Sequence, residues 1–247
     1  MPKILVIGGS DGSGGAGVFA DHETLISLGS KAEFIVTSVT SQNDEVFLGS
    51  HDLPPSTLEL QFEAISLGDF NAIKIGMLPS VEAVEVVSKY LSDASQKIVM
   101  DPVLRSSSGG SLSTNETISA MQELLFPKVD LLTPNLLEAF SLINLDEDQE
   151  IQIEEIASQC LELGSDSVLL KGGHLSGVIC KDILVEKAKA PVIFERDKIQ
   201  GGTEVRGTGC RLASSITHFL AEGRNLEGAV NAGIEFLQSY IRKTLNN

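Results

Sequence analysis

A Gly-Thr-Gly-Cys segment at residues 207–210 is followed directly by an apolar-periodic run that begins at Leu212. Where glycines lead into a helix, several backbone N–H groups lack helical partners and can bind an anion such as a transferring phosphoryl group. The dipole of the same helix would lower the pKa of Cys210, which makes its thiol a candidate base or nucleophile. A glycine linker before a small buried cysteine is the plainer alternative. Glycines on both sides of Thr208 favour the anion site.

A second glycine-rich segment, residues 8–17, follows the first apolar run and leads into a helix expected to begin near Ala16. Its glycines let a ligand approach the backbone closely. Gly12, Gly14 and Gly17 have the spacing of a dinucleotide-binding fingerprint, but about four residues separate them from the apolar run. That fingerprint requires the turn immediately after the strand. The segment therefore favours ligand binding over a simple turn, and it indicates a dehydrogenase only weakly.

Acids, an amide and a lysine follow three later apolar runs. Asp101 ends one run, and Asn135 and Glu138 follow another. Their oxygens suit a Mg²⁺ ion that keeps most of its waters and is completed by nucleotide phosphates. On spacing alone, Asn135 as a helix N-cap with Glu138 as its capping-box partner is an equally good interpretation. Lys171 opens a Lys-Gly-Gly-His segment and could neutralise phosphate charge, although such a segment is more often an ordinary strand-to-loop turn.

The elements that must position these residues are short apolar runs alternating with helical patterns. Their continuous hydrophobicity is what strands need when helices cover both faces of a parallel sheet. Buried strands are predicted over residues 4–7, 34–39, 72–75, 98–100, 129–132 and 168–170, and helices over 81–91, 212–220 and 226–241. We therefore expect a three-layer α/β/α fold with a mainly parallel central sheet, in one domain over residues 1–247. Ligands should bind at the carboxyl ends of the strands.

The composition of the chain indicates which kinds of binding partner and which location to expect. Lys and Arg total 18 against 34 Asp and Glu, and the net charge of −16 disfavours nucleic acid and acidic membrane surfaces as partners. No apolar run approaches the roughly 18 residues of a membrane span, and no signal segment is evident. Cys160, Cys180 and Cys210 form no CxxC pair, so we expect a reducing, cytoplasmic location and no disulfide framework.

Taken in order, these segments resemble the hydroxymethylpyrimidine/phosphomethylpyrimidine kinases of thiamine biosynthesis, which belong to the ribokinase-like superfamily. The resemblance covers nearly the whole chain. The matching segments are residues 9–17 with 20–21, then 40–43, 74–78, 101–103, 133–138, 171–174 and 207–210. Each segment alone is a weak indication, and the ordered set is highly specific.

The resemblance implies a homodimeric, ribokinase-like enzyme that uses ATP and Mg²⁺. Its substrates would be the small molecule 4-amino-5-hydroxymethyl-2-methylpyrimidine and then the monophosphate of that pyrimidine. The implied substrate-binding residues are Gly9, Asp21 and Gln42, with Met77 and Val103 packing nearby. The implied catalytic residues are Cys210 as base, Gly207, Thr208 and Gly209 as anion hole, and Lys171 facing the phosphates. The implied metal-organising residues are Asp101, Asn135 and Glu138.

Some positions depart from the family pattern. Gly12 replaces a usual proline, and residues 106–110 lack a lysine that is common in the family. Arg105 or Arg206 could supply the missing charge.

Two alternative functions stay open at this point. Pyridoxal kinases share the Gly-Thr-Gly-Cys loop, but Gln42 can both donate to and accept from an aminopyrimidine edge. A non-catalytic pyrimidine-binding relative is supported by the missing lysine alone, and the intact Cys210, Asp101 and Glu138 argue against it.

Overall fold

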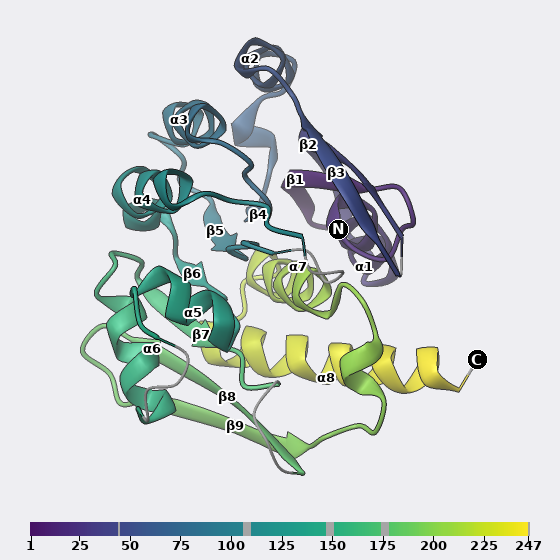
Figure 1. Ribbon diagram of the computed structural model, residues 1–247, viewed down its shortest axis with the longest axis vertical. Helices are drawn as coiled ribbons and strands as arrows, with labels where there is room; N and C mark the ends of the chain where they lie inside the picture. The colour runs from purple at the N-terminus through teal and green to yellow at the C-terminus, as the bar shows by residue number, and fades with distance from the viewer. Residues whose placement is uncertain (44, 106–109, 147–150, 174–177, 247) are drawn as a thin grey trace.

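The computed structural model describes residues 1–43, 45–105, 110–146, 151–173 and 178–246. In this part of the chain nine strands form one sheet, in the order β3-β2-β1-β4-β5-β6-β7-β8-β9 (Figure 1). The strands are β1 (Lys3–Asp11), β2 (Lys31–Gln42), β3 (Phe47–Asp52), β4 (Ala72–Ile75), β5 (Lys97–Met100), β6 (Leu131–Leu132), β7 (Ser167–Leu170), β8 (Ile179–Glu186) and β9 (Val192–Asp197). The six neighbouring strands β2, β1, β4, β5, β6 and β7 pair in parallel. Strands β3, at one edge, and β8 and β9, at the other, pair antiparallel.

Helices cover both faces of this sheet. They are α1 (Gly17–Ser27), α2 (Pro55–Glu63), α3 (Val81–Tyr90), α4 (Asn115–Leu124), α5 (Leu136–Leu142), α6 (Ile153–Leu161), α7 (Thr208–Ala221) and α8 (Leu226–Leu245), with short 3₁₀ turns η1 (Leu67–Asp69), η2 (Phe126–Lys128) and η3 (Gly202–Glu204). Side chains of α2 to α6 pack in one hydrophobic cluster, while α1, α7 and α8 pack against the other face (Figure 1). The expected three-layer α/β/α fold with a mainly parallel sheet is confirmed.

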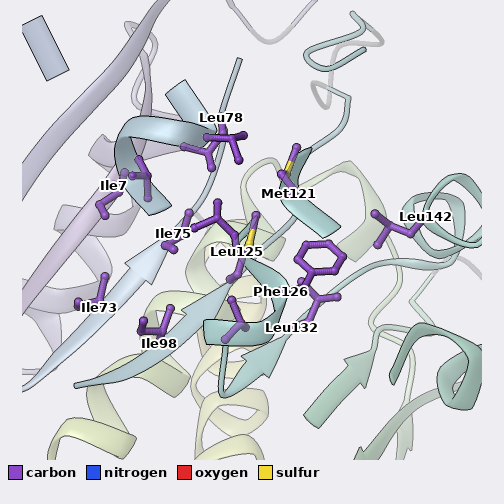
Figure 2. Packing of buried hydrophobic residues seen from close by; sticks show 14 of the residues in the cluster. Ile7, Ile73, Ile75, Leu78, Ile98, Met121, Leu125, Phe126, Leu132 and Leu142 are labelled. Atoms are coloured by element: carbon purple, nitrogen blue, oxygen red, sulfur yellow. The ribbon is translucent and has the colours of Figure 1, made fainter. Parts of the chain in front are cut away.

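Neighbouring residues of the central strands enter different layers. Leu5 and Ile7 of β1 belong to the cluster under α2 to α6, whereas Ile4 and Val6 pack against α1. Figure 2 shows part of the first cluster, in which strand residues such as Ile7 and Ile75 lie on the same side of the sheet as the helix residue Met121. Because side chains alternate across a strand, burial on both faces requires an unbroken apolar run. This arrangement explains the continuous hydrophobicity of the central strands.

The predicted elements are found with small shifts at their ends. All six predicted strands coincide with β1, β2 and β4 to β7, and the three predicted helices with α3, α7 and α8. The antiparallel strands β3, β8 and β9 were not predicted. Strands β3 and β9 lack an apolar run and largely alternate between half-buried and exposed residues, and β8 has only three apolar residues in a row, 183–185, after an alternating start. Among the described helices, none combines the length and apolar character needed to cross a bilayer.

Candidate functional site

The parallel strands end at one edge of the sheet, and the residues that follow them line one cavity. Its volume is about 580 Å³, which is typical of sites for small molecules. The thirteen residues predicted to bind or act on ligands all line it: Gly9, Asp21, Gln42, Met77, Asp101, Val103, Asn135, Glu138, Lys171, Gly207, Thr208, Gly209 and Cys210. The structure thus brings every predicted site residue to the expected edge, while their individual roles stay predictions.

The glycine-rich segment after β1 forms a turn around Asp11. The Asp11 carboxylate accepts hydrogen bonds from the backbone N–H and the hydroxyl of Ser13, at 3.0 and 2.8 Å. Gly17 has φ of 60°, and a Cβ there would lie 2.4 Å from the carbonyl oxygen of Gly9, so glycine is required. Strand β1 extends through Asp11 because its last residues still pair with β2. The predicted gap between the strand and the glycines is therefore wrong, and Gly12 follows the strand directly.

Helix α7 begins beside this turn, and glycine is required where the two backbones meet. Gly207 has φ of 68°, and a Cβ there would lie 2.1 Å from the carbonyl oxygen of Gly15. A Cβ on Gly209 would lie 3.2 Å from both Asp101 Oδ2 and Lys171 Nζ, so the first turn of α7 approaches that pair closely. N–H groups in a first helical turn lack helical partners and carry partial positive charge. The helix start agrees with an anion hole at residues 207–210, whose role stays a prediction.

The acidity of Cys210 differs from the prediction. Burial raises the pKa of its thiol to about 11, although the positive charge of Lys74 acts in the opposite direction. The negative charges of Asp21 and Asp101 raise this pKa further, and a backbone hydrogen bond from Gly17 partly offsets them. Burial favours the neutral thiol because the thiolate would lose its hydration. The predicted lowering of the pKa is wrong, and Cys210 is a neutral thiol near pH 7.

Lys171 connects the two predicted acids. Its Nζ lies 2.7 Å from Asp101 Oδ1 and 3.9 Å from Glu138 Oε2. Burial alone would lower the pKa of Lys171, but the negative charges of Asp101 and Glu138 raise it above its ordinary value. Burial raises the pKa of Glu138 to about 7, and the charge of Lys171 partly offsets that effect. Lys171 therefore stays cationic in the cavity, where it can attract a phosphate group.

The oxygens predicted to organise Mg²⁺ are partly engaged. Asn135 Oδ1 accepts from the backbone N–H of Glu138 at 2.9 Å, and Glu138 Oε2 accepts from that of Asn135 at 2.8 Å. This is the capping box of α5, the alternative considered from spacing. Over the described ranges, no group of three His, Cys, Asp or Glu side chains is placed to hold a metal ion. Asp101 and Glu138 fit an ion held through waters and nucleotide phosphates, and the predicted metal role of Asn135 stays a prediction.

A buried ion pair next to the cavity was not predicted. Lys74 in β4 lies 2.8 Å from Asp21 Oδ2, and Ser214 donates to Asp21 Oδ1 at 2.7 Å. Burial alone would lower the pKa of Lys74, but the negative charges of Asp21 and Asp101 raise it above its ordinary value. Lys74 and Ser214 each donate to one oxygen of Asp21 and so fix this carboxylate at the cavity wall, and its predicted contact with the substrate stays a prediction. The sequence did contain an indication, because a lysine inside an apolar strand needs a buried partner.

The residues predicted to contact a ring come from separate strand ends. Gln42 is the last residue of β2, Met77 follows β4, and Val103 follows β5. A Cβ on Gly9 would lie 2.8 Å from Met77 Sδ, so glycine lets this side chain lie against the backbone of β1. Gln42 Nε2 donates to the hydroxyl of Thr40 at 2.9 Å. Together they offer apolar contact and one amide, a combination suited to a flat polar ring.

The two arginines considered as substitutes for the missing lysine have different surroundings. Arg206 forms an ion pair with Asp11, with Nη2 3.0 Å from Oδ2. Arg105 is exposed and lines the cavity. Both arginines line the cavity, and compensation for the missing lysine by either of them stays a prediction. The segment in which the lysine is missing, 106–109, lies outside the described residues, as does His174.

Known proteins similar to this chain include phosphomethylpyrimidine kinases and pyridoxal kinases. The family model for phosphomethylpyrimidine kinase matches residues 11–247. A hydroxymethylpyrimidine/phosphomethylpyrimidine kinase from Streptomyces coelicolor is 33% identical over 97% of this chain and 88% of its own length.

The solved structures that resemble this chain are also kinases. A phosphomethylpyrimidine kinase from Clostridium difficile has a TM-score of 0.82 and 31% identity, covering 98% of this chain and 100% of its own. The pyridoxal kinase from Staphylococcus aureus in complex with pyridoxal has a TM-score of 0.87 and 28% identity, covering 98% of this chain and 88% of its own. The same pyridoxal kinase has also been solved with ADP and with AMP-PCP. The similarity favours a kinase over a dehydrogenase.

Proposed function

Because the chain belongs to the phosphomethylpyrimidine kinase family, we propose that it phosphorylates 4-amino-5-hydroxymethyl-2-methylpyrimidine with ATP and then phosphorylates the resulting monophosphate. The product would be the pyrimidine diphosphate used in thiamine biosynthesis. The observation that carries the proposal is the convergence of all thirteen predicted site residues on one cavity, in a chain that matches the family over almost its full length. The ribokinase-like fold agrees with this function.

The chemistry follows from the two sides of the cavity. The hydroxymethyl group would be presented by the ring-binding side, near Gln42 and Met77, toward the N-terminus of α7. Backbone amides of residues 207–210 would stabilise the charge on the phosphoryl group as it passes from ATP to the acceptor oxygen. Lys171 would attract the phosphates, held in position by Asp101 and Glu138.

Mg²⁺ is proposed to accompany ATP. When bound, it would neutralise phosphate charge and align the transferring group. Asp101 and Glu138 would hold it through waters, and Asn135 would contribute by capping α5 and so fixing Glu138. Burial raises the pKa of Glu138 to about 7 in the ligand-free protein, and a nearby cation would favour its ionised form.

The test is to incubate the protein with ATP and Mg²⁺ and one of three acceptors: the hydroxymethylpyrimidine, its monophosphate, or pyridoxal. ADP and phosphorylated product are measured together, so that ATP hydrolysis without transfer is recognised. We expect both pyrimidine acceptors to be converted, with one ADP formed for each phosphoryl group transferred. Absence of product with all three acceptors would refute the kinase assignment.

Phosphorylation of pyridoxal is a second candidate activity. It is supported by the higher TM-score to a pyridoxal kinase, at 0.87, than to a phosphomethylpyrimidine kinase, at 0.82. Gln42 at the cavity wall favours the aminopyrimidine, because an amide can both donate to and accept from its edge. A higher kcat/KM for pyridoxal than for the hydroxymethylpyrimidine would reverse the order of the two candidates.

Assembly and location complete the proposal. The homodimer implied by the family resemblance and the cytoplasmic location expected from the cysteine pattern stay predictions. Sedimentation equilibrium would measure the first and cell fractionation the second.

A further inference from the structure

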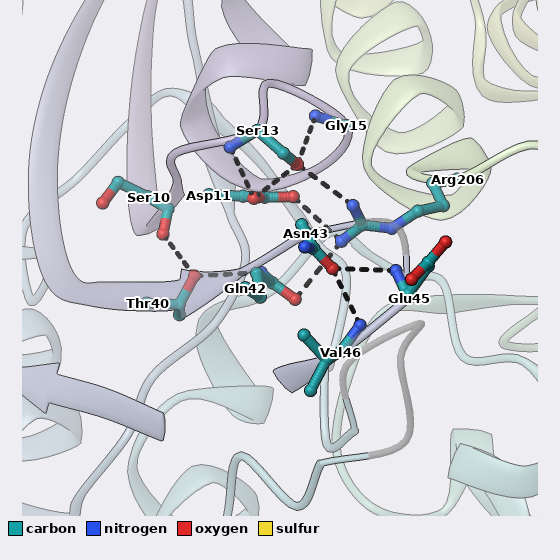
Figure 3. A network of polar contacts seen from close by, with 10 residues as sticks. All are labelled: Ser10, Asp11, Ser13, Gly15, Thr40, Gln42, Asn43, Glu45, Val46 and Arg206. Atoms are coloured by element: carbon teal, nitrogen blue, oxygen red, sulfur yellow. Dashed lines mark hydrogen bonds and ion pairs between the residues drawn. The ribbon is translucent and has the colours of Figure 1, made fainter. Parts of the chain in front are cut away.

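Arg206, the residue before the proposed anion hole, joins three separate parts of the site (Figure 3). Its Nη2 lies 3.0 Å from Asp11 Oδ2 and 3.3 Å from Gln42 Oε1, and its Nη1 lies 3.0 Å from the hydroxyl of Ser13. The side chain of Arg206 is 12% exposed, and that of Asp11 is 1% exposed. With so little solvent around the pair, its charges are weakly screened, and removing one of them would leave the other buried without its partner.

Glycines make room for this guanidinium. A Cβ on Gly15 would lie 3.0 Å from Arg206 Nη1, and one on Gly207 would lie 2.1 Å from the carbonyl oxygen of Gly15. The turn after β1 and the start of α7 therefore approach each other with Arg206 between them. Its position is determined by backbone contacts as well as by charge.

The contacts of Gln42 determine which neighbour its amide oxygen faces and which neighbour its amide nitrogen faces. An arginine only donates hydrogen bonds, so the Gln42 atom facing Arg206 must be the oxygen. Thr40 donates its hydroxyl proton to the carbonyl oxygen of Ser10 at 2.8 Å, so it accepts at the other end from Gln42 Nε2, at 2.9 Å. A flipped amide would place its NH₂ group against the arginine donors. The order of donor and acceptor along the amide is thereby fixed.

We propose that Arg206 is a positioning residue that makes the site selective for an aminopyrimidine, an inference that rests on the proposed function. By holding Gln42 Oε1, it keeps the amide in the one orientation in which its donor and acceptor match the adjacent amino group and ring nitrogen of the substrate. Pyridoxal has no such amino group, so its recognition depends less on this orientation. Arg206 acts through Gln42 and requires no contact with either substrate.

The test uses Arg206→Met, which keeps the apolar stem and removes the donors. We expect KM for the hydroxymethylpyrimidine to rise by about tenfold, the usual effect of losing one charge-assisted hydrogen bond. KM for ATP should stay unchanged, and kcat should change by less than about threefold. The ratio of kcat/KM for the pyrimidine to that for pyridoxal should fall by about tenfold. Arg206→Lys, which retains a donor, should recover part of the loss, and Arg224→Met, at a distant exposed arginine, should have no effect.

A double-mutant comparison separates positioning from general damage. In a Gln42→Leu background, Arg206→Met should add little further change in KM, because its effect passes through that amide. Arg206→Met leaves the carboxylate of Asp11 buried without its arginine. If the Tm of Arg206→Met is lowered, the double variant Asp11→Asn with Arg206→Met is measured as well, because it removes both charges of the pair. If the wild type turns over normally and the ratio of kcat/KM for the pyrimidine to that for pyridoxal is unchanged in the Arg206 variants, the inference about Arg206 is wrong and the proposed function stands. A wild type that makes no product would overturn the proposed function and this inference with it.

Discussion

At the scale of single residues, the thiol of Cys210 lies in the first turn of α7, and its burial raises its pKa to about 11. Little thiolate is present at neutral pH to take a proton from the acceptor hydroxyl in advance. Phosphoryl transfer tolerates such a weak base, because its transition state is loose and the hydroxyl loses its proton late. Most of the rate enhancement then comes from positioning and from charge stabilisation by the helix amides.

Replacing the thiol should separate the two proposed steps. In the first step a neutral hydroxyl attacks, whereas in the second the attacking phosphate oxygen is already anionic. We expect Cys210→Ala to lower kcat for the hydroxymethylpyrimidine by about 10²-fold and kcat for the monophosphate by less than about tenfold. Initial rates with each acceptor supplied separately give the comparison, and Cys210→Ser serves as the variant that keeps a small polar group. Equal losses in both steps would contradict this account.

Site residues could be predicted where neighbouring residues in the sequence mark them, and could not where the contact joins residues far apart in the sequence. Gly207 to Cys210 and the residues after β5, β6 and β7 were identified because a strand end or a helix start marks each of them in the sequence. The pairing of Lys74 with Asp21, 53 residues apart, and of Arg206 with Asp11, 195 apart, leaves no local pattern. Such pairs depend on the tertiary fold. The pKa of Cys210 was mispredicted for the same reason, since its burial is set by side chains distant in sequence.

At the scale of elements, the start of α7 depends on its close approach to the turn after β1. Gly207→Ala would place a Cβ 2.1 Å from the carbonyl oxygen of Gly15, so one backbone must move. We expect kcat/KM to fall by at least about 10²-fold, because displacement of the anion hole weakens transition-state stabilisation. Gly223→Ala is a matched control at the other end of α7, with φ of 88° and nothing within 4 Å. It should cost about 1 kcal/mol of stability and leave activity unchanged. Equal activity losses in the two variants would show that the contact with Gly15 does not matter.

The far end of α7 is anchored by a histidine. His218 is buried, and its Nδ1 lies 2.7 Å from the hydroxyl of Ser30. Burial lowers the pKa of His218 below its ordinary value of 6.5, and Glu222 partly offsets this. The unfolded chain therefore binds a proton more readily than the folded one, so stability is lost as pH falls below about 6.5. Between pH 7.5 and 5.5 we expect Tm to fall more in the wild type than in His218→Asn.

The exposed His51 provides the control for that measurement. His51→Asn should follow the wild-type curve over the same pH range. If the curves of the wild type and His218→Asn run parallel, His218 does not contribute to the pH dependence.

The central strands were predicted from the sequence and the edge strands were not, and this difference has a physical explanation. Burial on both faces makes a central strand uniformly apolar, so β1, β4, β5 and β7 stand out against the helical patterns around them. Edge strands β3 and β9 have an exposed face and read as polar segments with scattered apolar residues. Their place in the sheet comes from pairing with β2 and β8. A search for alternation would have been needed to find them.

At the scale of the whole molecule, strand order determines where the cavity forms. From β1 the sheet grows through β2 on one side and through β4 on the other. A point at which the strand order reverses in this way is called a topological switch point. The connections that leave the strand ends there run in opposite directions, and they leave a crevice at the carboxyl ends of the strands. The cavity lies there, between the turn after β1 and the residues after β4 and β5. This position follows from the alternation of strands and helices, which explains why it could be predicted before the individual contacts.

The prediction of one domain over residues 1–247 leads to a thermodynamic expectation. The same strands contribute to the cores on both faces of the sheet: Val99 faces α7 and α8, while its neighbours Ile98 and Met100 face α2 to α6. Neither core can be exposed without removing support from the other, so unfolding should be cooperative. Differential scanning calorimetry should give one transition, with equal calorimetric and van't Hoff enthalpies. If the chain dimerises as proposed, Tm should also rise with protein concentration. Two resolved transitions, or a proteolytic fragment that melts cooperatively by itself, would show that residues 1–247 contain more than one folding unit.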